Sequence, residues 1–334
     1  MEVRPYKIHV EDEVLDDLKF RLERTRWPEP IRGSRWEYGS NIDYIKELCA
    51  YWQYVYDWRK WEAELNKWPS YMVEIDGVDI RFWHVKGKGE NPFPLLLLHG
   101  WPGASFEFFE MIGPLTDPAA YGGDWGSMIC ARLGIRYPEQ ACALHLNYAN
   151  LPIPMIDELP PEDMEACDRQ MEFDFWEGAY HLIMETKADS LTVAQCDSPA
   201  GFAAWVIEKF RTWSDCNGDL ESVYTKDQLL TIIMFYWAGN SIFSAARLYY
   251  ESFHNPELHW GAPDPQIKSP TGVAFFPKDP FNRPNSPDFW QCPRMEKSHR
   301  FIRLLRRCRL DQVSLRHPAS PVIRSISQAV VMYS

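Results

Sequence analysis

The sequence predicts an α/β fold, because its central part has the pattern of a buried strand, tight turns and a helix. Residues 95–98 are four leucines in a row, typical of a strand that is buried on both faces of a sheet. A turn rich in glycine and proline follows at residues 99–103 (His-Gly-Trp-Pro-Gly). A second turn lies at residues 122–126 (Gly-Gly-Asp-Trp-Gly), and residues 127–133 can continue from it as a helix.

This second turn has the layout of a nucleophile elbow. In the G-x-S-x-G motif the nucleophile occupies a sharp, strained turn between a strand and a helix, so its neighbours are small. Asp124 takes the place of the serine here, between Gly122 and Gly126. A carboxylate at this position can attack carbon directly and form an ester without a base to deprotonate it. A plain surface turn is the alternative, because Gly-Asp pairs are common in turns; residues 99–103 favour the elbow.

Length and composition favour one or two compact folding units. The chain has 334 residues, 46% of them hydrophobic, and its net charge of −12 disfavours nucleic acid and anionic lipid as partners. We expect no transmembrane segment, since no apolar run reaches about 18 residues, and no signal peptide. The eight cysteines contain no C-x-x-C pair. They indicate reduced thiols in a cytoplasmic protein, not disulfides or a zinc site.

The N-terminal part is expected to be helical and the next part to form a hairpin. Apolar spacing predicts helices over residues 11–26 and 40–65, and six of the 15 tryptophans lie before residue 70. These aromatic side chains need a surface to pack on. The period then changes to two, which predicts a β-hairpin over residues 71–85 with an Asp-Gly turn. A helix is expected to begin at residue 105.

After the elbow we expect a strand, a mostly helical region and one late strand. The expected elements are a strand at 141–147, helices at 197–213, 228–237 and around 243–248, and a strand at 270–277. Residues 291–334 differ in character, with nine Lys or Arg residues against two acids.

Several motifs, in order along the chain, closely resemble the microsomal-type epoxide hydrolases. They are Lys7-Ile8-His9-Val10, Arg24-Thr25-Arg26-Trp27-Pro28, Trp36-Glu37-Tyr38-Gly39, Tyr56-Asp57-Trp58-Arg59, Glu74-Ile75-Asp76-Gly77, His99-Gly100-Trp101-Pro102-Gly103 and Gly123-Asp124-Trp125-Gly126. The resemblance covers most of the chain to about residue 280. It implies an α/β-hydrolase fold with a helical lid, preceded by a helical N-terminal segment that wraps the core.

The resemblance also divides the chain into parts. They are a helical N-terminal segment at 1–70, the first part of the α/β-hydrolase core at 71–149, the lid at 150–260, a late core strand with an acid turn at 261–290, and a basic tail without a family match at 291–334.

The family chemistry converts apolar epoxides to vicinal diols through an ester on an aspartate. Carried over by matching motifs, Asp124 is the nucleophile, Tyr180 and Tyr249 protonate the ring oxygen, and the backbone N–H groups of Trp101 and Trp125 bind the oxyanion. Asp279 corresponds to the acid that orients the catalytic histidine, where the family commonly has glutamate. The resemblance implies an apolar epoxide and water as partners, and no cofactor or metal; it leaves the oligomeric state open. Packing tyrosines, packing indoles and a solvated turn acid are the alternatives for these residues.

Two departures from the family bear on activity. Residues 118–121 replace a strand, a helix and a further strand, and a βαβ unit needs about 30 residues. The sheet is therefore expected to be incomplete, with no strand leading into Asp124. The family's Gly-Gly-His-Phe segment with the catalytic histidine has no match. His299 and His317 follow no expected strand, and His99 belongs to the oxyanion loop, so we expect slow turnover or none.

Two other functions remain open at this point. A haloalkane dehalogenase also has an aspartate elbow followed by tryptophan, but its lid uses Trp or Asn halide donors and it lacks the N-terminal segment. A non-catalytic binder of apolar ligands on the same fold is favoured by the missing histidine motif, because fold alone does not determine function.

Overall fold

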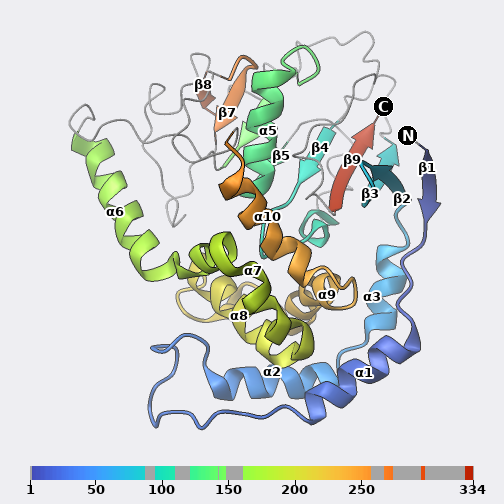
Figure 1. Ribbon diagram of the computed structural model, residues 1–334, viewed down its shortest axis with the longest axis vertical. Coiled ribbons are helices and arrows are strands. Elements are labelled where there is room, and N and C mark those ends of the chain that lie inside the picture. The colour runs from blue at the N-terminus through green and yellow to red at the C-terminus, as the bar shows by residue number, and fades with distance from the viewer. Residues whose placement is uncertain are drawn as a thin grey trace. The chain divides into compact units, whose positions relative to one another are not determined.

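The computed structural model describes residues 2–86, 95–109, 121–141, 143–147, 161–256, 267–273, 295–297 and 328–333 (Figure 1). The contacts divide the chain into two compact units. The first unit consists of Met1–Tyr6, Trp68–Tyr180 and Ser252–Ser334, and the second of Lys7–Lys67 and His181–Glu251.

The first unit is built on a nine-stranded sheet in the order β1-β2-β3-β9-β4-β5-β6-β7-β8. The strands are β1 (Val3–Tyr6), β2 (Ser70–Ile75), β3 (Val78–Lys86), β4 (Leu95–Leu98), β5 (Tyr121–Gly122), β6 (Leu144–Leu146), β7 (Thr271–Val273), β8 (Met295–Lys297) and β9 (Gln328–Tyr333). β1, β2 and β3 are antiparallel, whereas β4 to β8 run parallel to one another. The predicted hairpin and the predicted strands near residues 95, 144 and 271 are confirmed.

The C-terminal strand β9 closes the centre of the sheet. It pairs parallel with β3, where Val331 lies opposite His84, and antiparallel with β4, where Val331 lies opposite Leu96. The ladder is therefore continuous, and the expected gap is not found among the described strands. This pairing was not predicted, because residues 291–334 were expected only to be a basic tail without a family match.

Two further expectations about strands are wrong. β5 leads directly into the turn at Asp124 and pairs on both sides, with Leu98 opposite Gly122 and Gly122 opposite Leu146. A strand of only two residues persists because both of its edges are hydrogen-bonded. In addition, β8 ends at Lys297, so a strand does precede His299. His299 itself lies outside the described residues.

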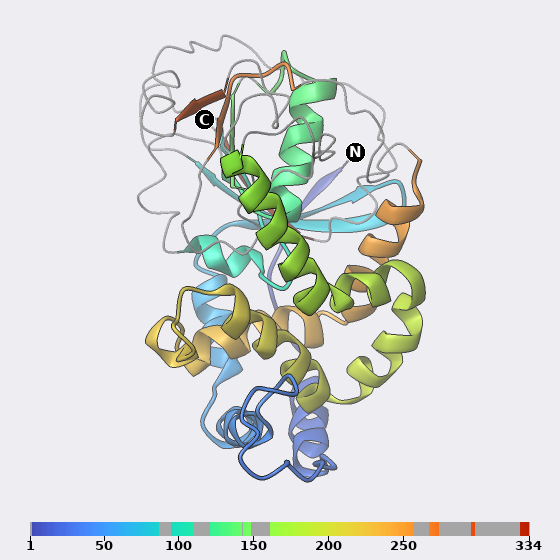
Figure 2. The same ribbon diagram turned by 90° about the vertical axis from the view of Figure 1, so that its left-hand side faces the viewer.

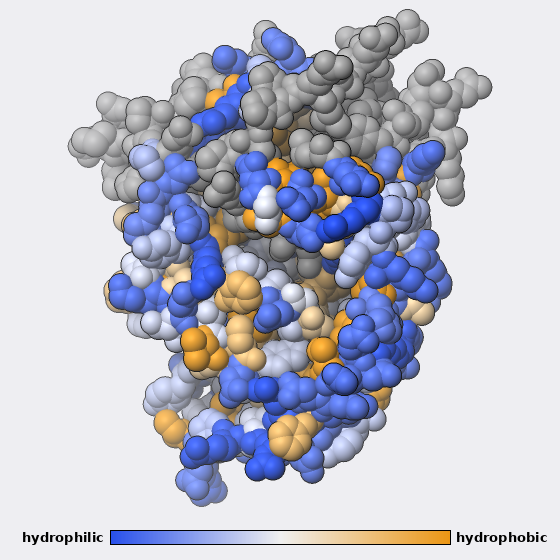
Figure 3. Space-filling view, turned by 45° about the vertical axis from the view of Figure 1, so that its right-hand side comes forward, coloured by the Kyte–Doolittle hydropathy of each residue, from blue (hydrophilic) through white to orange (hydrophobic). Residues whose placement is uncertain are grey.

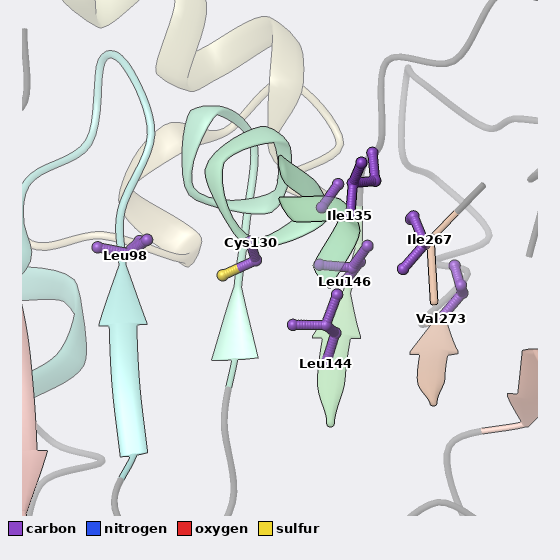
Figure 4. Close-up of a cluster of buried hydrophobic side chains, with 8 residues drawn as sticks. Leu98, Cys130, Ile135, Leu144, Leu146, Ile267 and Val273 are labelled. Carbon is purple, nitrogen blue, oxygen red and sulfur yellow. The ribbon is translucent and has the colours of Figure 1, made fainter. Parts of the chain in front are cut away.

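Helix α5 (Trp125–Arg136) packs on β4, β5 and β6, and both ribbon views show it along these strands (Figures 1 and 2). Side chains from the helix and the strands gather between them (Figure 4). The buried members of this cluster are Leu98, Cys130, Ala131, Ile135, Leu144, Leu146, Ile267 and Val273. At Gly126 the helix touches the strand backbone: a Cβ there would lie 2.0 Å from the Leu98 carbonyl oxygen. Only glycine permits this approach.

The remaining described elements of the first unit are η1 (Ser105–Phe108) and α6 (Pro161–Glu177). η1 is a short 3-10 turn where the sequence predicted the start of a longer helix. The coloured residues on the face drawn in Figure 3 are mostly hydrophilic, with smaller hydrophobic groups between them.

The second unit is helical. It contains α1 (Asp12–Glu23), α2 (Ile42–Tyr54), α3 (Trp58–Leu65), α8 (Pro199–Trp213), η3 (Leu220–Ser222), α9 (Lys226–Trp237) and most of α7 (Ala179–Asp197) and α10 (Ile242–His254). Helices α8 and α9 confirm the predicted pattern and begin with strong caps. The Ser198 hydroxyl accepts the Gly201 N–H, and Thr225 and Gln228 form a reciprocal capping box.

The single helix predicted over residues 40–65 is two helices. The Asp57 carboxylate accepts the backbone N–H groups of Arg59 and Lys60, so it starts α3 as an N-cap. α2 has already ended at Tyr54, and its C-cap residue Val55 has a non-helical φ of −121°.

The N-terminal helices pack against the helices of residues 181–251, which explains the early tryptophans. Trp52 is fully buried, and Tyr51 and Trp61 both donate hydrogen bonds to the Asp227 carboxylate of α9, at 2.8 and 3.2 Å. In the part of the chain that the structure describes, no single helix is long and apolar enough to cross a membrane. Helices α9 and α10 reach the required length and composition only as a pair, across a 74° bend.

The position of β9 generates a stability prediction. Val331→Pro removes one N–H from a strand that is paired on both sides, and each buried ladder group left unpaired costs about 1–3 kcal/mol. We expect a lower midpoint of urea unfolding. Val3→Pro on the edge strand β1, which already contains Pro5, is the matched control and should shift the midpoint far less. Equal shifts for the two variants would contradict the central position of β9.

Candidate active site

Asp124 is held in a strained turn between β5 and α5. Its backbone has φ 50° and ψ −124°, a conformation that costs a residue with a side chain about 1–3 kcal/mol. Gly126, two residues further on, lies against the Leu98 backbone, so the helix start cannot move away to relax the turn. The turn and the helix predicted from residues 122–133 are therefore present, and β5 supplies the preceding strand that was not expected.

The backbone of the 99–103 turn closes on the Asp124 carboxylate. The Trp101 N–H donates to Asp124 Oδ1 over 2.8 Å. A Cβ at Gly100 would lie 2.1 Å from the same oxygen, so this residue must be glycine for the carboxylate to occupy its place. His99 Nδ1 lies 3.0 Å from the Gly100 carbonyl oxygen, to which it can donate.

Asn147, which the sequence reasoning missed, supports the turn from the neighbouring strand. Its Oδ1 accepts the Asp124 N–H at 3.3 Å and the Ser127 hydroxyl at 3.1 Å, and its own N–H donates to Ser127 Oγ at 3.3 Å. Ser127 is fully buried. Asn147 follows β6, and ligand sites in α/β sheets gather at the carboxyl ends of strands. That rule, applied to the end of the predicted strand at 141–147, is the signal that could have found Asn147.

Trp101, Trp125 and Tyr180 surround this turn with aromatic groups. The Trp101 indole and the Tyr180 phenol stack with centroids 5.1 Å apart and planes 7° from parallel, and both side chains are buried. Trp125 is the first residue of α5. Its backbone N–H therefore lies in the first turn of the helix, where N–H groups point out of the helix N-terminus. The positive end of the helix dipole favours negative charge at this position, where Asp124 lies.

Glu107 on η1 is a second carboxyl group beside Asp124 that the sequence reasoning missed. Its side chain keeps solvent-accessible surface, yet enough protein surrounds it to raise its pKa to about 8. Burial is the larger cause, the negative charge of Asp124 adds to it, and the Ala104 backbone hydrogen bond opposes both. A Cβ at Gly103 would lie 2.3 Å from Glu107 Oε2. The only sequence signal is an acid between Phe106 and Phe108.

The structure brings together Asp124, Trp101 and Tyr180, with Trp125 next to the nucleophile position. Tyr249 is a buried residue of α10 in the second unit. Asp279, His299 and His317 lie outside the described residues. No three His, Cys, Asp or Glu side chains converge as a metal site requires among the residues that are described.

Comparisons with known proteins agree on one family. The model of the epoxide hydrolase N terminus matches residues 3–108. Epoxide hydrolase 1 of Oryctolagus cuniculus is 31% identical over 355 aligned positions, which cover 82% of this chain and 78% of that protein. Juvenile hormone epoxide hydrolase 1 of Ctenocephalides felis is 30% identical over 353 positions, covering 84% and 76%.

A solved structure is similar to this chain in fold. Juvenile hormone epoxide hydrolase from the silkworm Bombyx mori aligns with a TM-score of 0.79 and 24% identity, over 88% of this chain and 87% of that one. Its likeness agrees with the α/β-hydrolase fold expected for the sheet, the elbow and the helical region. From the two sequence relatives and this fold, the chain belongs to the microsomal-type epoxide hydrolase family and is an epoxide hydrolase.

Proposed function

We propose that this enzyme opens apolar epoxides by attack of Asp124 on a ring carbon, forming an ester that water then hydrolyses to a vicinal diol. The observation that carries the proposal is the presentation of the Asp124 carboxylate on the strained turn, with the Trp101 N–H on Oδ1. We assign the attack to Oδ2, so that Oδ1 becomes the ester carbonyl. Names of relatives that act on juvenile hormone support an apolar epoxide as the substrate class.

Ring opening needs an acid, because an alkoxide is a poor leaving group. A phenol has a pKa of about 10 and is therefore protonated at neutral pH. Tyr180 is the acid we assign from the first unit, supported by its stacking on the Trp101 ring, whose backbone N–H holds Asp124. As the carbon–oxygen bond of the ring breaks, the phenol proton passes to the ring oxygen and leaves a tyrosinate. Tyr249 is the second acid that the family resemblance implies.

Ester hydrolysis places a negative charge on Oδ1 when water attacks the Asp124 carboxyl carbon. The Trp101 N–H already points at this oxygen, and the Trp125 N–H at the start of α5 is the second donor we assign. Each donor of this kind is worth roughly 3–4 kcal/mol in the transition state. The family's base for this water is a histidine oriented by the acid at Asp279, and the sequence has no match to that histidine motif.

The nucleophile is tested by labelling. An aryl epoxide such as styrene oxide should add its mass to the peptide that contains Asp124, detected by mass spectrometry after an acid quench. Asp124→Asn should remove the label, because a neutral amide is a far weaker nucleophile. A label on another carboxylate, with the Asp124 peptide unmodified, would disprove the assignment.

The acid is tested by removing one hydroxyl group. Tyr180→Phe should slow ester formation by roughly 10²-fold, since a positioned general acid contributes about 10²–10⁴-fold. The measurement is the single-turnover rate of ester formation under rapid quench. Tyr54→Phe changes a tyrosine that is 76% exposed and serves as the control. Equal rates for Tyr180→Phe and the control would exclude Tyr180 as the acid.

The missing histidine motif generates a prediction about turnover. We expect about one equivalent of epoxide per chain to be consumed in a fast phase that forms the ester, followed by slow diol formation, because hydrolysis without the family's histidine forgoes about 10²–10⁴-fold. Steady diol formation without accumulation of the ester, lost in His299→Ala, would make His299 the base. Steady formation that survives both His299→Ala and His317→Ala would place the base elsewhere.

A further inference from the structure

We propose that Glu107 is a catalytic residue of this site: its carboxylate takes the proton from the water that attacks the Asp124 ester. The inference rests on the proposed function, since it requires an ester at Asp124. It assigns the general base for ester hydrolysis to a side chain of η1, beside the nucleophile Asp124.

Geometry places both carboxyl groups directly on one turn. A Cβ atom added to Gly100 would lie 2.1 Å from Asp124 Oδ1. A Cβ atom added to Gly103 would lie 2.3 Å from Glu107 Oε2. The two glycines are three residues apart, so at most about 11 Å of extended chain separates them. Each carboxyl group thus fills the space left by a missing side chain on the same turn.

The position of Glu107 is fixed by its own short element. η1 begins at Ser105, directly after the turn, and the Glu107 N–H donates to the Ala104 carbonyl oxygen over 3.0 Å. Ser105 and Phe108 on either side of it are buried, which anchors the backbone. Glu107 is itself an exposed residue.

The charge of Asp124 couples the two groups. In the free enzyme, burial and the Asp124 charge raise the pKa of Glu107 to about 8, so that Glu107 is mostly protonated at neutral pH. Formation of the ester removes the Asp124 charge, and the pKa of Glu107 then falls. Glu107 therefore becomes a stronger acid after alkylation, and a larger fraction of it is ionised when a base for water is needed. Paired carboxyl groups in known active sites divide their roles in this manner.

The proton balance of the step closes. Glu107, ionised in the intermediate, accepts a proton from water as its oxygen bonds to the Asp124 carboxyl carbon, which gives a tetrahedral oxyanion. Collapse breaks the bond between that carbon and the alkyl oxygen. The alkoxide takes the remaining carboxyl proton and leaves as diol, and Asp124 is again a carboxylate. The proton that Glu107 releases after alkylation restores the tyrosinate to a phenol, and the proton taken from water leaves Glu107 protonated, as it is in the free enzyme.

The test separates formation of the ester from its decay. The full chain is mixed with styrene oxide, quenched at set times and analysed by intact mass, with diol measured in the same samples. Glu107→Gln imitates the protonated carboxyl group in shape and charge. We expect ester formation within about threefold of the unmodified chain and ester decay slower by roughly 10²-fold. Glu74→Gln, the same change at an exposed position of β2, is the matched control and should leave both rates unchanged.

The alternative outcomes are distinct. Ester decay in Glu107→Gln at the rate of the unmodified chain would overturn the inference and leave the Asp124 chemistry intact. Equal losses in formation and decay would show that Glu107 only supports the turn, which also overturns it. Absence of ester from every variant, the unmodified chain included, would refute the proposed function itself. Glu107→Asp, which withdraws the carboxyl group by one methylene, gives a second reading: decay should slow less than in Glu107→Gln, and unchanged decay in both overturns the inference.

Discussion

The close contact between α5 and β4 is the constraint on which the rest of the site depends. Gly126 lies so near the Leu98 carbonyl oxygen that a methyl group there would be 2.0 Å away. Because the helix begins this close to the sheet, the chain must turn sharply after β5, and Asp124 takes a positive φ of 50°. The cost of that conformation is offset by the apolar cluster beneath α5, in which each buried large aliphatic side chain contributes about 1.5–3 kcal/mol.

The turn at residues 99–103 likewise depends on glycines, which have no Cβ atom. Gly100 and Gly103 leave room for the carboxyl groups of Asp124 and Glu107, and the Trp101 N–H points at the first of them. Two acids near one turn repel each other when both are ionised, so the protonation of one depends on the state of the other. Alkylation of Asp124 is therefore also an electrostatic event for Glu107.

The continuous sheet holds in place the strand that leads into the turn at Asp124. β5 is only two residues long, and it is stable because β4 and β6 pair with its two edges. β4 in turn is paired on its other edge by β9, which comes from the end of the chain. In the second unit, Asp227 of α9 plays a comparable role, since its carboxylate accepts hydrogen bonds from Tyr51 and Trp61 of the N-terminal helices.

The sequence by itself determined the features that arise within a few residues of one another. The leucine run of β4, the Asp-Gly hairpin, the capped helices α8 and α9 and the glycine-flanked turn at Asp124 all follow from local rules. The motifs around residues 99–103 and 123–126 also identified the family before any contact was known. Local rules missed the break between α2 and α3, and they predicted a longer helix where η1 is a short 3-10 turn.

The tertiary structure alone decided which distant segments meet. The insertion of β9 between β3 and β4, the existence of β5, and the approach of Asn147 and Glu107 to Asp124 leave no periodic pattern in the chain. Tyr249 and Asp279 stay predictions from the resemblance. The physical reason is that strand pairing and electrostatic coupling act through space, between residues as far as 247 positions apart, whereas propensity, caps and turns act along the chain.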